Sequence, residues 1–296
     1  MNGVINVNKP AGWTSQDVCA KLRGRLHIKK IGHTGTLDPM ATGVLPVCTG
    51  NATRIIEYYD RDHKTYHAEM QLGITTDTLD ITGEVLETSD HTGVNENAVR
   101  EAFKAYTGEV SQIPPKYSAL KVNGRRAYEL AREGRDFEIK AREVTIYRNE
   151  ITSMDLERGL IGFYVECSKG TYIRTICDDI GRNLGCGACM TALCRTGSGV
   201  FRIEDAADIE DLCDMSDDEI ASRVIKPEDT LVMLGRIELN DNRVIAFTNG
   251  NSTRSGGYRI TEASRFDELY RVYSEGRFLG VAGTENGSLV PHKVFR

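Results

Sequence analysis

The sequence predicts an α+β fold with a large N-terminal domain and a small β-rich C-terminal domain. Helical and strand patterns both occur up to about residue 185, but they do not alternate as a doubly wound parallel sheet requires. From about Leu231 onward the pattern is rich in strands with tight turns, at residues 274–276 and 285–287. A chain of 296 residues also exceeds the usual size of one hydrophobic core.

The N-terminal elements follow from local signals. Residues 4–7 predict a short strand, which ends at the Lys-Pro-Ala-Gly run of residues 9–12. Thr14 or Ser15 caps a helix that extends to about Leu26. Residues 29–54 are rich in Gly, Thr and Pro, which predicts a long structured loop that leads into a short helix.

The middle of the chain contains clearer periodicity. Residues 65–73 alternate between apolar and polar side chains, as a half-buried strand does. Asn95 caps a helix that extends through Tyr106, and residues 113–115 (Ile-Pro-Pro) break the chain. The remaining predicted elements are a short helix at 125–133, strands near 143–152 and 161–167, and a helix at 172–184 that ends at Gly185.

Composition excludes several classes of protein. The chain is 40% hydrophobic and 27% charged, which argues against a mostly disordered chain. No apolar run approaches the roughly 20 residues that a membrane helix needs, and the N-terminus lacks a signal-peptide pattern. We therefore expect a cytoplasmic protein without a membrane partner, in which the 8 scattered cysteines are reduced thiols.

Charge is distributed unevenly along the chain. The net charge is −6, yet residues 204–219 hold nine acids and no base, and we expect that stretch to be helical and exposed. Residues 116–148 hold nine bases against five acids. Clustered bases are compatible with a polyanionic partner, and they are equally compatible with solvated helix faces.

The densest group of unusual residues is Gly-His-Thr-Gly-Thr-Leu-Asp-Pro-Met-Ala-Thr-Gly-Val-Leu at 32–45. It has neither the phosphate-binding spacing of a P-loop nor a dinucleotide fingerprint. Its one carboxylate, Asp38, precedes Pro39, which favours an extended backbone and fixes the direction of the side chain. Local features alone favour a different role, in which Asp38 caps a helix that begins after Pro39. Cys186 and Cys189 lack a second pair of ligands, so we expect no metal site.

Residues 32–46 closely resemble the catalytic motif of the bacterial tRNA pseudouridine synthases that isomerise uridine 55 in the TΨC loop. Further motifs resemble the same family in the same order: NVNKPAG (6–12), KTY (64–66), LGITTDTLD (72–80), IPPKYSALK (113–121) and SKGTYIRT (168–175). The resemblance implies a pseudouridine synthase catalytic domain at 1–228, with a mixed β-sheet and flanking helices. It also implies an RNA-clamping insertion at about 114–142 and a PUA-like RNA-binding domain at 229–296.

The resemblance implies a catalytic role for three residues. Asp38 would be the nucleophile, attacking C6 of the base or C1′ of the ribose, and Arg174 would keep it ionised. Tyr66 would stack on the base and take the proton from C5. The isomerisation neither gains nor loses atoms, so no cofactor or metal is expected. Two departures from the family pattern are Cys189 and Cys194, which replace a histidine and an arginine.

The resemblance also implies how the substrate is held. Lys9 and Pro10 would support the active-site loop, His33 would contact the T loop, and Leu193 would lie against the flipped base. The implied substrate-binding residues are Lys9, Pro10, His33, Lys121, Arg125, Arg126, Tyr172 and Leu193. The expected partner is the TΨC stem-loop of tRNA, bound by a monomer without a guide RNA. Two alternatives are an RNA chaperone that has lost catalysis and a synthase that acts on ribosomal RNA.

Overall fold

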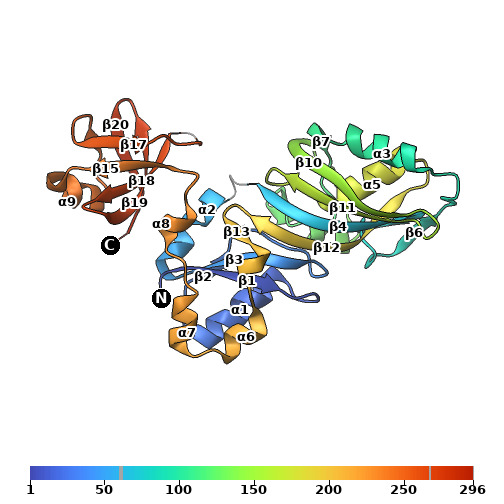
Figure 1. The fold of residues 1–296 in the computed structure, drawn as a ribbon, viewed down its shortest axis with the longest axis horizontal. Helices are drawn as coiled ribbons and strands as arrows, with labels where there is room; N and C mark the ends of the chain where they lie inside the picture. The colour runs from blue at the N-terminus through green and yellow to red at the C-terminus, as the bar shows by residue number, and fades with distance from the viewer. Residues whose placement is uncertain (60–62, 267, 296) are drawn as a thin grey trace.

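The computed structural model of the protein describes residues 1–59, 63–266 and 268–295. Figure 1 shows a large N-terminal domain built on one long sheet and a smaller C-terminal domain packed against one end of it. Helices cover the sheet of the larger domain, so the predicted α+β class is confirmed.

Within the described residues, ten strands form the sheet of the N-terminal domain in the order β14-β1-β3-β12-β4-β11-β10-β7, with β2 on β3 and β13 on β12. Their bounds are β1 (Gly3–Lys9), β2 (Ile31–His33), β3 (Thr42–Thr49), β4 (Lys64–Leu72), β7 (Gly108–Gln112), β10 (Arg142–Asp155), β11 (Leu160–Cys167), β12 (Ala188–Ser198), β13 (Phe201–Arg202) and β14 (Ala207–Asp208). Two small hairpins lie outside it, β5 (Ile74–Thr76) with β6 (Val85–Thr88) and β8 (Lys121–Val122) with β9 (Arg125–Arg126).

The sheet has a narrow junction between β3 and β12. These strands run parallel and pair only at Thr42 with Cys194 and Gly43 with Arg195. Gly43 has a φ of +101°, and a Cβ at this position would lie 2.2 Å from the carbonyl oxygen of Arg195. Only glycine fits so close an approach. The junction places the loop that precedes β3 beside β4 and β12.

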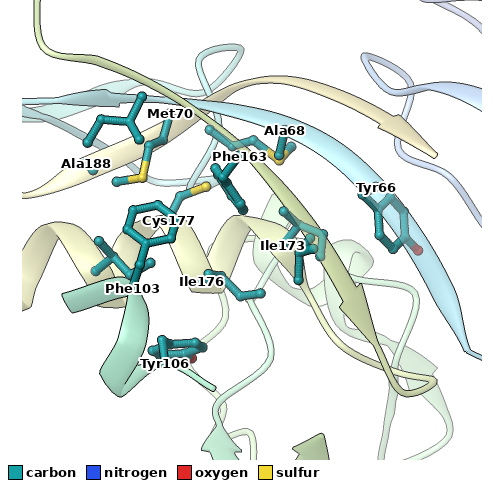
Figure 2. Close-up of a cluster of buried hydrophobic side chains, with 14 of the residues drawn as sticks. Tyr66, Ala68, Met70, Phe103, Tyr106, Phe163, Ile173, Ile176, Cys177 and Ala188 are labelled. Atoms are coloured by element: carbon teal, nitrogen blue, oxygen red, sulfur yellow. The ribbon is translucent and has the colours of Figure 1, made fainter. Parts of the chain in front are cut away.

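Helices cover the two halves of this sheet separately. α1 (Ser15–Leu26) packs on β1 and β3, whereas α3 (Glu96–Ala105) and α5 (Ile173–Asn183) pack on β4, β11 and β12 (Figure 1). Figure 2 shows the second of these cores, in which Phe103 and Phe163 meet edge to face. The predicted caps Thr14 and Asn95 are confirmed, and each such cap stabilises its helix by about 1 kcal/mol.

Six strands of the sheet were not predicted: β2, β3, β7, β12, β13 and β14. The prediction of a loop over 29–54 was wrong, because β2 and β3 occupy part of it, and β7 and β12 were also missed. Seven of the eight residues of β3 are buried and it contains Gly43 and Pro46, so it shows no alternation. In β12, irregularities in the register at Met190/Ala192 and Arg195/Gly197 interrupt the two-residue period.

The acidic stretch behaves as predicted. It forms α6 (Ile209–Asp214) and α7 (Asp217–Ser222), and its nine acidic side chains are exposed while Ile209, Leu212 and Ile220 are buried. The other short helices are α2 (Ile56–Tyr59), α4 (Ala127–Arg132), α8 (Pro227–Thr230) and the 3₁₀ turns Gly50–Ile55, Ile203–Asp205 and Asp241–Arg243. In the described part of the chain, no helix is long and apolar enough to cross a membrane.

The C-terminal domain is a six-stranded sheet in the order β16-β20-β19-β18-β15-β17. Its elements are β15 (Gly235–Leu239), α9 (Val244–Thr248), β16 (Thr253–Arg254), β17 (Tyr258–Glu262), β18 (Leu269–Ser274), β19 (Arg277–Glu285) and β20 (Ser288–Val294). The two predicted turns are confirmed, since Glu275 and Asn286 have positive φ and each precedes a glycine. Leu234 and Val281 pack against Val44 and Tyr59, so an apolar interface joins the domains.

Candidate active site

Asp38 and Arg174 form an ion pair at the sheet junction. Asp38 lies in the loop between β2 and β3, and Arg174 lies in the first turn of α5. Arg174 Nε lies 3.0 Å from Asp38 Oδ2, and its Nη2 donates to Oδ1 at 3.2 Å. The guanidinium thus binds both carboxylate oxygens, the strongest geometry for such a pair. The sequence motifs that hold these two residues are 136 positions apart, and the fold brings them together.

The rest of the Arg174 guanidinium is also bound. Nη1 donates to the Thr78 carbonyl at 2.9 Å and lies 3.4 Å from Asp80 Oδ2, and Nη2 donates to the Tyr117 carbonyl at 3.0 Å. Asp80 is itself buried, and its Oδ1 accepts from the Thr82 amide at 3.0 Å. Arg174 is therefore held in one orientation toward Asp38 by groups from two segments, residues 78–80 and Tyr117.

The electrostatics of Asp38 result from two opposing effects. Burial raises the pKa of Asp38 above its usual value, while the adjacent Arg174 charge favours the ionised form. The side chain of Asp38 still exposes a third of its surface, whereas that of Arg174 exposes 5%. The buried cation thus faces a carboxylate that remains open on its other side, as a nucleophile must.

Lys9 fixes the loop that carries Asp38. It is fully buried, and its Nζ donates to the carbonyl oxygens of Pro10, Trp13 and Pro39 at 2.8, 2.5 and 3.2 Å. Burial lowers the pKa of Lys9 to about 8, and Asp38 acts against that effect. Residues 39 and 40 form a turn before β3, so the alternative that Asp38 caps a helix after Pro39 is wrong.

A cavity of about 240 Å³ opens over the Asp38–Arg174 pair. Tyr66 from β4 and Leu193 from β12 form part of its wall, and Tyr172 lies at the start of α5. Gln112 fixes Tyr172 by exchanging two hydrogen bonds with its backbone, at 2.7 and 3.1 Å. The described residues that line the cavity are Gly35, Thr36, Leu37, Asp38, Lys64, Tyr66, Ser118, Ala119, Gly170, Thr171, Tyr172, Ile173, Arg174, Leu193 and Arg195.

Other predicted site residues lie outside this cavity. His33 is on β2, and burial lowers its pKa, with Arg195 adding to the effect. Lys121, Arg125 and Arg126 lie on the β8–β9 hairpin, where Arg125 pairs with Glu133 and Arg126 donates to the Ala119 carbonyl. The hairpin follows the segment whose Tyr117 carbonyl accepts a hydrogen bond from Arg174, so the basic cluster is connected to the cavity.

Sequence reasoning missed several residues at the site. Asp80 stands at the end of the motif at 72–80, but nothing in its local pattern indicates a buried partner for Arg174. Arg195 is 1% exposed and lines the cavity from a strand that was not predicted. Cys189, at the family's histidine position, is buried, which raises its pKa to about 11. Among the described residues, no group of three or more His, Cys, Asp or Glu could hold a metal ion.

The chain resembles known proteins over its whole length. Residues 23–173 match the TruB family pseudouridylate synthase N-terminal domain, and residues 174–233 match the tRNA pseudouridylate synthase B C-terminal domain. The sequence is 42% identical to tRNA pseudouridine synthase B of Clostridium kluyveri, over 100% of both chains. It is 43% identical to the Clostridium novyi protein of the same name, over 99% of both.

Two solved structures have the same fold. A chain in the crystal structure of a Cbf5-Nop10-Gar1 complex superposes with a TM-score of 0.78 and 27% identity, over 99% of this chain and 85% of that chain. A chain in the structure of an H/ACA RNP bound to a substrate RNA containing 2'-deoxyuridine gives a TM-score of 0.75 and 26% identity, with the same coverage.

Proposed function

Because the chain belongs to the TruB family of pseudouridylate synthases, we propose that it isomerises uridine 55 of tRNA to pseudouridine with Asp38 as the nucleophile. The observation that carries this proposal is the Asp38–Arg174 pair beneath a small cavity walled by Tyr66 and Leu193. A carboxylate that is held ionised and open on one side is suited to attack a substrate carbon and to leave again.

The reaction requires three changes at one nucleotide. The N1–C1′ bond breaks, the base turns within the cavity, and C5 joins C1′. The C5 proton is lost and N1 gains one, so the sum of atoms does not change. Arg174 contributes by keeping Asp38 ionised, since burial alone favours the protonated acid. Asp80 and the Thr78 and Tyr117 carbonyls contribute by fixing Arg174.

The cavity is on the scale of one base, so the target uridine must leave its stack to enter it. Extrusion costs a few kcal/mol, and stacking on Tyr66 with apolar contact to Leu193 would offset that cost. Tyr66 would also take the C5 proton. The active-site loop would be supported by Lys9 and Pro10. The RNA would be contacted by His33 and Tyr172.

The proposed substrate is the TΨC stem-loop of tRNA, bound by a monomer in the cytoplasm without a guide RNA. The full-length identity of 42–43% to proteins named tRNA pseudouridine synthase B supports this choice over the Cbf5-Nop10-Gar1 and H/ACA RNP assemblies, to which the identity is 26–27%. Lys121, Arg125 and Arg126 of the insertion at about 114–142 would contact RNA phosphates. We further propose that residues 229–296 are a PUA-like RNA-binding domain, separate from the catalytic residues 1–228.

Two other functions are less well supported. An RNA chaperone without catalysis would have no need for an assembled Asp38–Arg174 pair with Asp80 behind it. A synthase for ribosomal RNA is disfavoured by the match along the entire chain to relatives named tRNA pseudouridine synthase B.

The direct test is to incubate the protein with an unmodified TΨC stem-loop and to map pseudouridine at single-nucleotide resolution. Pseudouridine at position 55 alone supports the proposal. Pseudouridine in a ribosomal RNA fragment but not in the stem-loop would favour the synthase for ribosomal RNA. If neither RNA is modified, the RNA chaperone without catalysis becomes the better interpretation.

A further inference from the structure

Arg195 is the largest fully buried side chain in the described part of the protein, at 1% exposure. It lies in β12 and donates from Nε to the Val44 carbonyl at 2.6 Å and from Nη2 to the Gly35 carbonyl at 3.1 Å. No carboxylate among the described residues forms an ion pair with it. Burial of a charge without a charged partner is strongly unfavourable. The arrangement therefore suggests that Arg195 serves a group whose charge changes during the reaction.

The acidic group beside Arg195 is the phenol of Tyr66. The two residues are direct partners in the antiparallel register of β12 and β4, and both line the active-site cavity. Figure 2 shows the Tyr66 ring at the end of the apolar cluster, with its hydroxyl pointing away from the other labelled side chains. The positive charge of the Arg195 guanidinium acts on this phenol and favours its ionised form.

Arg195 and Tyr66 each favour the charged form of the other. Burial raises the pKa of Tyr66 to about 12, Arg195 acts against that increase, and Cys167 and Asp38 add to it. Among the described residues, the acidic group that favours the charged form of Arg195 is this phenol, and Arg195 also lies near the cationic Lys9 and near His33. A guanidinium stays protonated when buried, so its positive charge at the phenol is permanent.

We propose that Arg195 is a positioning residue that stabilises Tyr66 as a phenolate for removal of the C5 proton. This inference rests on the proposed function. Tyr66 first loses its proton to solvent. The C5–H bond then breaks, the proton goes to the Tyr66 oxygen, and the electron pair forms the C5–C6 double bond. The pair displaced from C6 leaves with Asp38 or moves onto N1, so charge and atoms balance.

A purely structural Arg195 would instead fix the loop at Gly35 and the strand at Val44. The two roles are separated by a double-mutant cycle with Tyr66→Phe. The rates to compare are single-turnover rates on a TΨC stem-loop, for the wild type, Arg195→Met, Arg195→Lys, Tyr66→Phe and Arg195→Met with Tyr66→Phe. Stem-loops with deuterium at C5 of the target uridine report whether C5–H cleavage limits the rate.

A phenolate role predicts a loss of about 10²-fold or more in rate for Arg195→Met, the usual scale of general-base catalysis. The affinity for the stem-loop should change by less than about threefold, and an isotope effect at C5 should appear or increase. Arg195→Lys, which keeps the charge, should recover part of the rate. Arg195→Met should cost little more once Tyr66 has lost its hydroxyl.

Three results would overturn the inference. The first is an Arg195→Met loss of equal size in the Tyr66→Phe background, and the second is a slow variant without any isotope effect. The third is unfolding of both Arg195 variants by circular dichroism, which would show that Arg195 serves the fold. A wild type that forms no pseudouridine would refute the proposed function instead, so the two failures are distinguishable.

Discussion

The guanidinium of Arg174 binds both carboxylate oxygens of Asp38, at 3.0 and 3.2 Å, across 136 positions of sequence. One partner lies in a loop at the sheet junction and the other in the first turn of α5. The ionisation of Asp38 therefore depends on the packing of α5 against the sheet. This dependence leads to the first prediction.

Replacing Arg174 with Met should move the acid limb of the pH–rate profile to higher pH. The reaction needs ionised Asp38, so its rate falls as the pH drops through the pKa of this residue. Burial already raises that pKa, and Arg174 opposes the rise, so removing the cation raises it further. The rate at the optimum should fall by about 10²-fold or more. Single-turnover rates from pH 5 to pH 9 provide the measurement.

Arg182→Met is the matched control for that experiment. Arg182 lies on the same helix and pairs with Asp178 at 2.9 Å, but its side chain is 70% exposed. Its loss should leave the acid limb in place. An unchanged limb in Arg174→Met would contradict the role given to the ion pair.

Lys9→Met should destabilise the folded protein by about 2–4 kcal/mol, because three carbonyl groups lose a buried charged donor. Urea unfolding followed by circular dichroism measures this change. Lys21→Met, at an exposed position of α1, should change stability by less than about 0.5 kcal/mol. Equal stability of the two variants would show that Lys9 does not hold the Asp38 loop.

Neutralising Lys121, Arg125 and Arg126 together should weaken tRNA binding and flatten its salt dependence. Each lost phosphate contact lowers the log–log slope of affinity against salt by roughly 0.7 to 0.9. The rate on saturating tRNA should fall less than the affinity, because these side chains lie outside the cavity. Titrations at several salt concentrations give the slope.

Arg100→Gln tests whether any lost surface charge has that effect. Arg100 is exposed on α3 and pairs with Glu96 at 3.4 Å. The slope of affinity against salt for Arg100→Gln should match that of the wild type. A triple variant with the wild-type slope would mean that the RNA clamp lies elsewhere.

A chelator should leave the rate unchanged when the substrate is a short stem-loop. The isomerisation neither gains nor loses atoms, so we expect it to need no metal ion. Full-length tRNA is avoided because its own folding depends on divalent cations. A rate that is lost with the chelator and restored only by zinc would instead indicate Cys186 and Cys189 as ligands.

Much of the fold could be predicted wherever the signal was local. The helix at 172–184, its end at Gly185 and the alternating strand at 65–73 follow from spacing and caps, and the structure has them as α5 and β4. The resemblance of long motifs supplied Asp38, Tyr66 and Arg174. These residues were identifiable because each stands inside an uninterrupted motif.

The rest depended on long-range contacts. β3 and β12 lie at the centre of the sheet, where burial on both faces and irregular register remove the two-residue period. Asp80 and Arg195 matter because of the residues they contact in the fold, Arg174 and Val44, which lie more than 90 positions away in the sequence. A pattern within one segment carries no information about such partners.

The central claim is that Asp38 is the nucleophile of a uridine isomerase, and one substitution tests it most directly. Asp38→Asn keeps the shape of the side chain but cannot attack carbon. The rate at which pseudouridine forms at position 55 of a TΨC stem-loop should fall by more than about 10³-fold in this variant. The affinity for the stem-loop should stay within about threefold of the wild type. An Asp38→Asn variant with a rate within about tenfold of the wild type would contradict the claim.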